Sequence, residues 1–294
     1  DAKFDKSAKV FQTDHTGISF DPVKAQEAFD ALDWGAAEAY PLEITQPKVT
    51  VADLAPQLYQ DVLGSCTTNI SGSSNRVENI RLAAKYFSGT VLLPGEEFSY
   101  NGTVGRRTAA RGFLPAPAYV GGETVQETGG GVCQGSSTIY LASLRANLEI
   151  VERYPHGYIT RYVPDGMDAT VYYGAKDFRF KNNTPFPIKV VGTVSGRTLT
   201  VNILGTKSDN IQVEMTNQVV GTTGYNTIYK IDSSLPAGST KVSVTPYAGY
   251  TVKVYRNLYE NGRLKDTKLE STSVYRSRDK VVLVSPEDAA QYGL

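Results

Sequence analysis

Residues 127–145 have the sequence Glu-Thr-Gly-Gly-Gly-Val-Cys-Gln-Gly-Ser-Ser-Thr-Ile-Tyr-Leu-Ala-Ser-Leu-Arg, in which three consecutive glycines lead into Cys133, one of only two cysteines in the chain. Glycine lets the backbone take positive φ angles and lets other groups approach the main chain closely. Leu141, Leu144 and Leu148 then recur at helical spacing, which predicts a buried helix that begins near Cys133. The stretch therefore predicts a tight loop that places a thiol at the mouth of a helix.

A thiol at a helix N-terminus faces unpaired backbone N–H groups and the positive end of the helix dipole. These groups stabilise a thiolate, which lowers the pKa of Cys133 and makes its sulfur a nucleophile near neutral pH. The same N–H groups, around Gly130, Gly131 and Gln134, could hold an oxyanion. The alternative is an inert cysteine, either buried or joined to Cys66 in a disulfide bond, and the residue pattern alone leaves both interpretations open.

The composition excludes several classes of protein. The chain has 294 residues, of which 40% are hydrophobic, and this is enough for two or more domains. Lys+Arg and Asp+Glu number 30 each, so the net charge does not favour nucleic acid as a partner. No apolar run approaches the roughly 20 residues that cross a bilayer, so membrane contact is expected only through a segment absent from this chain. The cysteine spacing does not match a zinc site, and neither a metal nor another cofactor is expected.

Two helices are predicted before residue 90. An Asp-Pro pair opens a helix over residues 21–32, because proline is favoured at the first helical position. Asn75 as N-cap and Glu78 as its capping-box partner predict a second helix, which a following glycine ends. Short strands are expected between the two helices, over residues 42–45 and 48–51.

The sequence after the central helix is typical of β structure. Strands are predicted over residues 149–154, 156–163, 168–173 and 177–180, pairing as a meander, and residues 187–193 and 198–204 predict a hairpin. The abundance of tyrosine and glycine, 19 and 27 residues, also indicates a β-rich chain with many turns. The predicted fold class is α+β: a central domain with two helices on a mainly antiparallel sheet, plus a C-terminal all-β module.

Two further groups of residues are candidates for the site. His156 follows Cys133 by 23 residues, and an imidazole is the usual base that activates a thiol. An exposed or structural histidine is the alternative, because chain distance does not establish contact. Arg106 and Arg107 cluster in a glycine-bearing loop, where they either bind a carboxylate by bidentate pairing or form a solvated basic loop.

Five blocks of the sequence resemble a VanW domain and occur in the order typical of that family. The blocks are Asn75-Arg76 with Asn79-Ile80, residues 93–101, Gly129-Gly130-Gly131-Val132-Cys133-Gln134, Gly166-Met167-Asp168-Ala169-Thr170-Val171, and residues 177–182. The preceding residues resemble the end of a peptidoglycan-binding domain, and the last part resembles a β-rich surface module named for its five glycines. The resemblance implies three parts: a partial peptidoglycan-binding domain over residues 1–57, the VanW domain over 58–207, and the five-glycine-like module over 208–294.

The resemblance also implies a function. It implies a peptidoglycan-modifying protein similar to a cysteine-dependent L,D-transpeptidase that acts on tetrapeptide stems. Cys133 would be the nucleophile, His156 the base and Asp168 the group that orients the base. The other expected site residues are the oxyanion loop and the substrate-binding arginines: Gly130, Gly131, Gln134, Arg76, Arg106 and Arg107.

Two alternatives remain beside this interpretation. Water as the acceptor in place of an amine would make the protein a carboxypeptidase. A non-catalytic peptidoglycan-binding surface protein is the alternative from a different class, and the flanking modules and many tyrosines favour it. Under either function the expected location is the extracellular face of a Gram-positive cell envelope, with anchoring by an N-terminal segment not present here.

Overall fold

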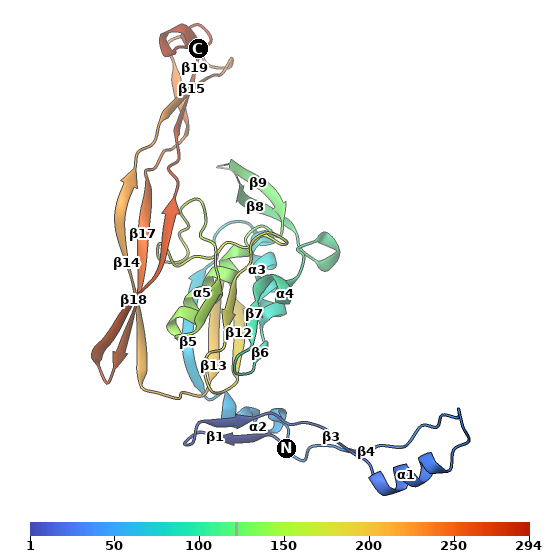
Figure 1. Cartoon of the computed structure of the whole chain (residues 1–294). Helices are drawn as coiled ribbons and strands as arrows, with labels where there is room; N and C mark the ends of the chain where they lie inside the picture. Colours follow the sequence, from blue (N-terminus) through green and yellow to red (C-terminus); the bar gives the residue numbers. More distant parts are fainter. Residues whose placement is uncertain (121–122) are drawn as a thin grey trace.

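The computed structural model describes residues 1–120 and 123–294. An extended N-terminal region, a central body of helices and strands, and a long C-terminal β arm follow one another along the chain (Figure 1). The helices are α1 (Pro22–Asp30), α2 (Val51–Leu58), α3 (Ser74–Phe87), α4 (Tyr100–Val104) and α5 (Cys133–Arg145), with short 3₁₀ turns η1 (Ala109–Arg111) and η2 (Ala289–Tyr292). The predicted α+β class is confirmed.

The central body is built on a four-stranded antiparallel sheet. Its strand order is β5 (Asp61–Asn69), β13 (Thr198–Gly205), β12 (Ile188–Ser195) and β6 (Val91–Leu92). Helix α5 packs on β5 and β13, and α3 packs on β12. Both contacts use glycines: a Cβ at Gly64 would overlap the backbone of α5, and one at Gly192 would overlap the ring of Phe87. The predicted hairpin is confirmed by the pairing of β12 with β13.

A second antiparallel sheet lies beside the first. Its order is β10 (Glu149–Glu152), β11 (Arg179–Lys181) and β7 (Glu97–Ser99). The strands predicted over 156–163 and 168–173 are wrong, and so is the meander, because these residues form an irregular segment. Its backbone groups bond to other elements instead: the N–H of Ala169 donates to Ser137 Oγ at 2.9 Å, and that of Gly166 to Tyr275 Oη at 2.7 Å.

Helix α3 begins two residues earlier than predicted and has a different cap. Ser73 is the N-cap, and its Oγ accepts a hydrogen bond from the backbone N–H of Arg76 at 3.3 Å. The predicted capping box of Asn75 with Glu78 is wrong. Asn75 lies within the first turn, and its side-chain amide donates to the carbonyl of Pro115 at 2.9 Å. Serine and asparagine are N-caps of similar strength. The contact of Asn75 with Pro115 therefore decides that Ser73 caps the helix.

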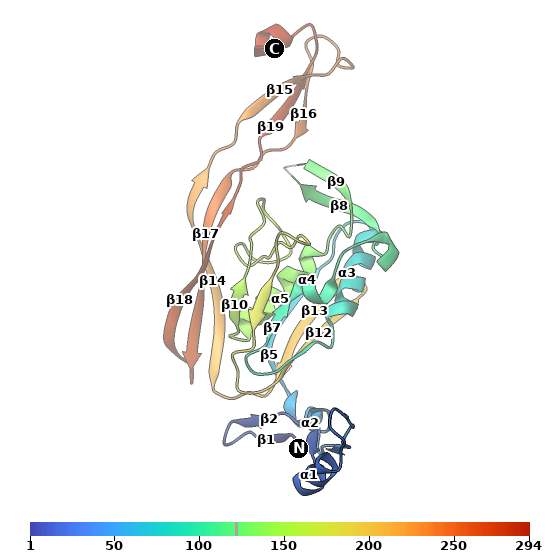
Figure 2. The ribbon, with the colours of Figure 1, turned by 45° about the vertical axis from the view of Figure 1, so that its right-hand side comes forward.

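The N-terminal region holds two short strand pairs, β1 (Lys3–Asp5) with β2 (Val10–Gln12) and β3 (Gly17–Ser19) with β4 (Glu43–Thr45). Helix α1 forms as predicted, but it buries no residue and lies far from the central body (Figures 1 and 2). The strand predicted over 48–51 is wrong because Thr50 is instead the N-cap of α2, in a capping box with Asp53.

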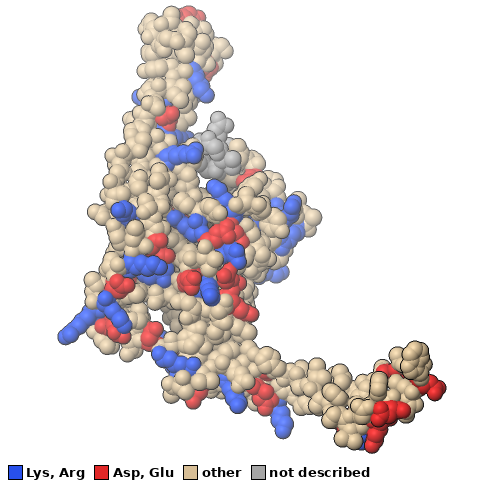
Figure 3. Space-filling view, in the orientation of Figure 1, with Lys and Arg blue, Asp and Glu red and all other residues tan. Residues whose placement is uncertain are grey.

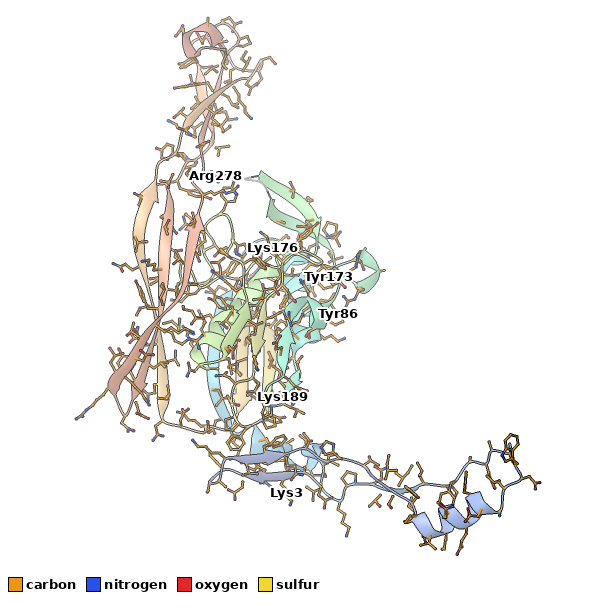
Figure 4. The ribbon with its side chains drawn as sticks, viewed as in Figure 1. Lys3, Tyr86, Tyr173, Lys176, Lys189 and Arg278 are labelled. Atoms are coloured by element: carbon orange, nitrogen blue, oxygen red, sulfur yellow. The ribbon has the colours of Figure 1, made fainter. Side chains whose placement is uncertain are left out.

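The C-terminal region is all β, as predicted. Strands β14 (Ile211–Thr223), β17 (Gly249–Glu260) and β18 (Arg263–Tyr275) form an antiparallel sheet that runs alongside the central body (Figures 1 and 2). A distal sheet has the order β15 (Thr227–Ile231), β19 (Lys280–Val284) and β16 (Thr240–Val244). Arg278 marks the place where the two sheets meet (Figure 4). Val252 and Val254 of β17 belong to the same buried cluster as the central body.

A hairpin of β8 (Pro115–Val120) and β9 (Glu123–Thr128) projects from the central body directly before α5 (Figure 2). Side chains of both charges are interspersed over the body on the face shown in Figure 3. No helix in the described parts of the chain is long and apolar enough to span a lipid bilayer.

Candidate active site

The glycine loop places Cys133 at the first position of α5, as predicted. Gly129 and Gly131 have φ angles of 86° and 101°, a region that residues with side chains rarely adopt. Gly130 lies against the carbonyl of Ala116 in β8, where a Cβ would overlap it. The loop therefore requires glycine at all three positions, and it turns the chain from β9 into the helix.

The structure brings His156 and Asp168 to the thiol. Both the backbone N–H and the ring Nδ1 of His156 donate to Oδ2 of Asp168, at 2.7 and 2.5 Å. The imidazole also lies near enough to Cys133 for each group to shift the pKa of the other. The thiol donates to the carbonyl of Val171 at 3.5 Å. Asp168 is fully buried, whereas the side chain of His156 is 20% exposed, so a buried carboxylate orients a partly exposed ring.

Hydrogen bonds and charges shift the pKa values in directions that favour an ion pair. Burial alone would raise the pKa of Cys133, but the hydrogen bond and charge of His156 lower it overall. Burial would lower the pKa of His156, yet its bonds to Asp168 and Cys133 raise that pKa to about 9. Burial would likewise raise the pKa of Asp168, but His156 and Arg153 hold it at about 2. The arrangement therefore favours the ionised forms of both the thiol and the imidazole.

Small polar side chains of α5 hold the Asp168 segment in place. The hydroxyl of Ser136 donates to the carbonyl of Ala169 at 2.7 Å, and the N–H of Ala169 donates to Ser137 Oγ at 2.9 Å. The same helix carries Cys133 at its start, so these bonds fix the distance between the thiol and the segment that orients its base. The two serines of the run Gly-Ser-Ser after Gln134 are thus part of the helix and also bind the segment that carries Asp168.

A cleft of about 290 Å³ opens in front of the sulfur. Its lining residues come from the arginine loop, the β8–β9 hairpin, the glycine loop and the segment after Asp168: Arg106, Arg107, Thr108, Ala118, Glu127, Thr128, Gly129, Gly130, Gly131, Val132, Cys133, Val171, Tyr172 and Tyr173. Tyr173, which lines this cleft, also lines a neighbouring cleft together with Lys176 (both labelled in Figure 4). Cys133 is half-buried and lines the cleft, so a substrate has a path to the thiol.

The three predicted arginines differ in their surroundings. Arg106 is exposed and lies over the ring of Tyr173, with 5.1 Å from its guanidinium carbon to the ring centroid. Arg107 donates to Asn101 Oδ1 at 2.7 Å, but its Nε and Nη2 are buried without a partner in the described part of the chain. Arg76 packs on the glycine loop and is absent from the lining of the cleft. Arg76 also has a buried nitrogen without a partner in the described residues, Nη1, so Arg107 is the one of the three that combines such nitrogens with a place in the cleft lining.

Gln134 is bonded within the protein at both its backbone and its side chain. Its N–H donates to the carbonyl of Gly131 at 3.0 Å, and its Nε2 donates to Thr68 Oγ1 and to the carbonyl of Asn69. Its Oε1 accepts from Arg76 Nη2 at 2.8 Å. In contrast, the N–H of Cys133 has no partner among residues 1–120 and 123–294. The donor open to an oxyanion is therefore on Cys133, and Gln134 supports the loop.

Cys66 lies apart from the site. Both cysteines are free, so a disulfide bond between them is excluded. Cys66 is buried in the core under α5, and burial raises the pKa of its thiol to about 11. Within the described residues, no group of three or more His, Cys, Asp or Glu side chains is arranged to hold a metal ion.

Three residues near the site were not predicted from the sequence. Arg153 is bonded to the carboxylate of Asp168 at 3.2 Å, and Tyr275 donates its hydroxyl to the same carboxylate. The hydroxyl of Tyr162 lies 3.4 Å from Nε2 of His156. No local pattern marks these residues, since all three belong to predicted β segments and Tyr275 lies 107 residues from Asp168 in the chain.

The fold and the site together define an α+β protein with a cleft lined by a cysteine thiol, an imidazole–carboxylate pair near that thiol, and an all-β extension. The chain matches the family described as VanW like protein over residues 75–204 and the family described as G5 domain over residues 213–286. It therefore carries a VanW-like domain followed by a G5 domain. This pair of domains fits an extracellular, cell-wall-associated protein.

The curated relatives agree with this assignment. Protein YoaR of Bacillus subtilis (strain 168) is 43% identical over 145 residues, which are 49% of this chain and 48% of YoaR. Vancomycin B-type resistance protein VanW of Enterococcus faecalis (strain ATCC 700802 / V583) is 25% identical over 150 residues, 49% of this chain and 54% of that protein. The chain thus spans about half the length of these relatives. The crystal structure of HP0197-G5 is 20% identical, with a TM-score of 0.16, and the match covers 26% of this chain and 97% of that one.

Proposed function

We propose that the protein is a cysteine acyltransferase of the cell wall, an L,D-transpeptidase acting on the tetrapeptide stems of peptidoglycan. The observation that carries the proposal is the hydrogen bond from the His156 ring to Asp168, next to Cys133, where thiol and imidazole shift each other's pKa toward the charged forms. Nucleophile, base and orienter in hydrogen-bond reach are the arrangement that activates a thiol. The VanW-like domain and its cell-wall context supply the class of substrate.

The chemistry follows from the positions of the groups. The thiolate of Cys133 attacks the carbonyl carbon of the third stem residue, and the backbone N–H of Cys133 donates to the oxyanion that forms. The imidazolium of His156 gives its proton to the leaving nitrogen, the C–N bond breaks, and D-alanine departs. A neighbouring stem amine then loses a proton to the imidazole and attacks the thioester, which releases the thiolate.

Arg107 is the proposed contact for a substrate anion. Its Nε and Nη2 are buried beside the cleft without a protein partner, and its charge also lowers the pKa of Cys133. A stem carboxylate would satisfy both nitrogens at once, since guanidinium binds carboxylate in a bidentate manner. Arg107→Gln should therefore raise KM for the tetrapeptide more than it lowers kcat. An unchanged KM in steady-state assays would remove Arg107 from the substrate site.

The central experiment is turnover of defined muropeptides. The full chain is incubated with disaccharide tetrapeptides, and the products are separated and weighed by mass spectrometry. We expect released D-alanine and a cross-linked dimer, both lost in Cys133→Ala and retained in Cys66→Ala, whose thiol lies outside the site. Absence of both products from the wild-type protein would refute the enzymatic proposal.

The same experiment separates the other functions. D-alanine released without a dimer would make the protein a carboxypeptidase, with water as the acceptor. Binding to sacculi without any turnover would favour the non-catalytic surface protein. The long sheet of β14, β17 and β18 is the observation that favours wall contact, since the G5 match covers it.

A further inference from the structure

The segment that carries His156 and Asp168 lies between α5 and the C-terminal sheet. The backbone N–H of Arg276 donates to the carbonyl of Gly157 at 2.8 Å, one residue after the histidine. Near the other end of the segment, a Cβ at Gly166 would overlap Val254 of β17. The C-terminal sheet therefore contacts this segment beside both of its proposed catalytic residues.

Asp168 divides its two carboxylate oxygens between two partners. Oδ2 accepts both bonds from His156. Oδ1 accepts from Tyr275 Oη and from Arg153 Nη2, the latter at 3.2 Å. Tyr275 is the last residue of β18, is 1% exposed, and also accepts the N–H of Gly166 at 2.7 Å. Its hydroxyl is thus fully used, and it fixes the rotation of the carboxylate about the bond to Cβ.

The same strand holds the second partner of the carboxylate. Arg153 Nη1 donates to Ser273 Oγ of β18 at 2.8 Å. Its Nε donates to the carbonyl of Asp168 at 2.6 Å, and its Nη2 also reaches the carbonyl of Gly166 at 2.9 Å. Ser273 is fully buried. Ser273 and Tyr275 are inward-facing residues of the same strand. Tyr275 binds Oδ1 directly, and Ser273 holds Arg153, the other group that binds Oδ1.

We propose that strand β18 of the G5 domain is a structural part of the active site, and that Tyr275 is a positioning residue that orients Asp168 toward His156. The inference rests on the proposed roles of Cys133, His156 and Asp168. Without the Tyr275 hydroxyl, the carboxylate can rotate away from the plane of the imidazole, and the imidazole then holds the thiolate less well. Ser273 acts in the same direction through Arg153. Catalytic activation of the VanW domain thus depends on side chains from the domain that follows it.

The test is the reactivity of Cys133 toward iodoacetamide as a function of pH, measured on the full chain by peptide mass spectrometry. The charged and titratable groups that face this thiol are His156, Tyr100, Tyr162, Arg76 and Arg107, and all are retained in the variants. Tyr275→Phe removes only the hydroxyl. Tyr250→Phe is the matched control, because its ring lies 5.4 Å from that of Tyr275 while the carboxylate that acts on its hydroxyl is Asp165 and not Asp168.

We expect Tyr275→Phe to move the pH midpoint of alkylation upward and to slow alkylation at pH 7 roughly tenfold, at the lower end of what one hydrogen bond to a charged group contributes. Ser273→Ala should move both quantities in the same direction by less, and Tyr250→Phe should match the wild type. If far-UV circular dichroism shows that Tyr275→Phe has unfolded, Ser273→Ala decides the result.

Failure of this inference is distinguishable from failure of the proposed function. If Asp168→Asn slows alkylation while Tyr275→Phe and Ser273→Ala keep the wild-type profile, the role of β18 is refuted and the proposed thiol activation stands. If the wild-type thiol titrates like an ordinary cysteine and Asp168→Asn leaves it unchanged, the proposed function and the inference fall together.

Discussion

Replacement of Asp168 by asparagine should remove a pH-dependent part of the folding free energy. The Asp168 side chain is 0% exposed, and its pKa lies at about 2 against an ordinary value of 3.8. At about 1.4 kcal/mol per pKa unit, this difference corresponds to about 2.5 kcal/mol of stability that the ionised group contributes. Because the folded pKa is the lower one, the contribution is present above about pH 4 and is lost as the pH falls toward 2.

The assay is urea unfolding followed by far-UV circular dichroism, for the wild type and Asp168→Asn, at several pH values from 6 to 2. Asparagine cannot titrate, while every other carboxylate is common to both proteins and cancels in the difference. The wild type should be the more stable at pH 6, since the variant leaves Arg153 buried without its charge partner. The gap between the two free energies should then narrow by about 2 kcal/mol on acidification to pH 2, where the folded-state carboxyl group is half protonated.

A gap of constant size between pH 6 and pH 2 would refute the reasoning. It would mean that the partners of Asp168 do not hold the carboxylate ionised in the folded protein. The orientation of His156 would then need another explanation, since a protonated carboxyl group cannot accept at Oδ2 while Tyr275 and Arg153 both donate to Oδ1.

Three further changes test the surroundings of the site. Gly130→Ala should abolish thiol activation and lower the melting temperature, because the new Cβ would overlap a backbone carbonyl of β8. Gly221→Ala is the control, because no atom lies near its Cβ position, and calorimetry should show a melting temperature within a few degrees of the wild type. Arg256→Met should lower the free energy of unfolding in urea by about 3–5 kcal/mol, because it leaves a buried carboxylate unpaired. Lys265→Met removes an exposed ion pair and should lower the same free energy by about 1 kcal/mol or less. Equal losses in the two variants would contradict this reasoning. Cys66→Ala should leave the alkylation rate at pH 7 unchanged, since burial raises the pKa of that thiol to about 11, and a fall in labelling would show that Cys66 had been the reactive group.

Local patterns predicted those elements whose hydrogen bonds lie within the element or between chain neighbours. The helix after the glycine loop and the hairpin of β12 and β13 are of this kind, and both form where the sequence places them. The segments at 156–163 and 168–173 have strand-like composition, but Ala169 bonds to α5 and Asp168 to Tyr275 of β18 rather than to neighbouring strands. Their tertiary partners outweigh their β propensity, which is a weak and context-dependent preference.

The sequence by itself determined that a thiol stands at the start of a buried helix behind three glycines, because glycine conformations and helical periodicity are properties of neighbouring residues. It did not determine what surrounds the base. The bonds of Asp168 to His156 and Arg153 cross 12 and 15 residues, and its bond to Tyr275 crosses 107. Only the packing of β18 against the central body brings Tyr275 to the carboxylate, because a contact between distant chain segments arises from burial of their shared core and leaves no periodic trace in either segment.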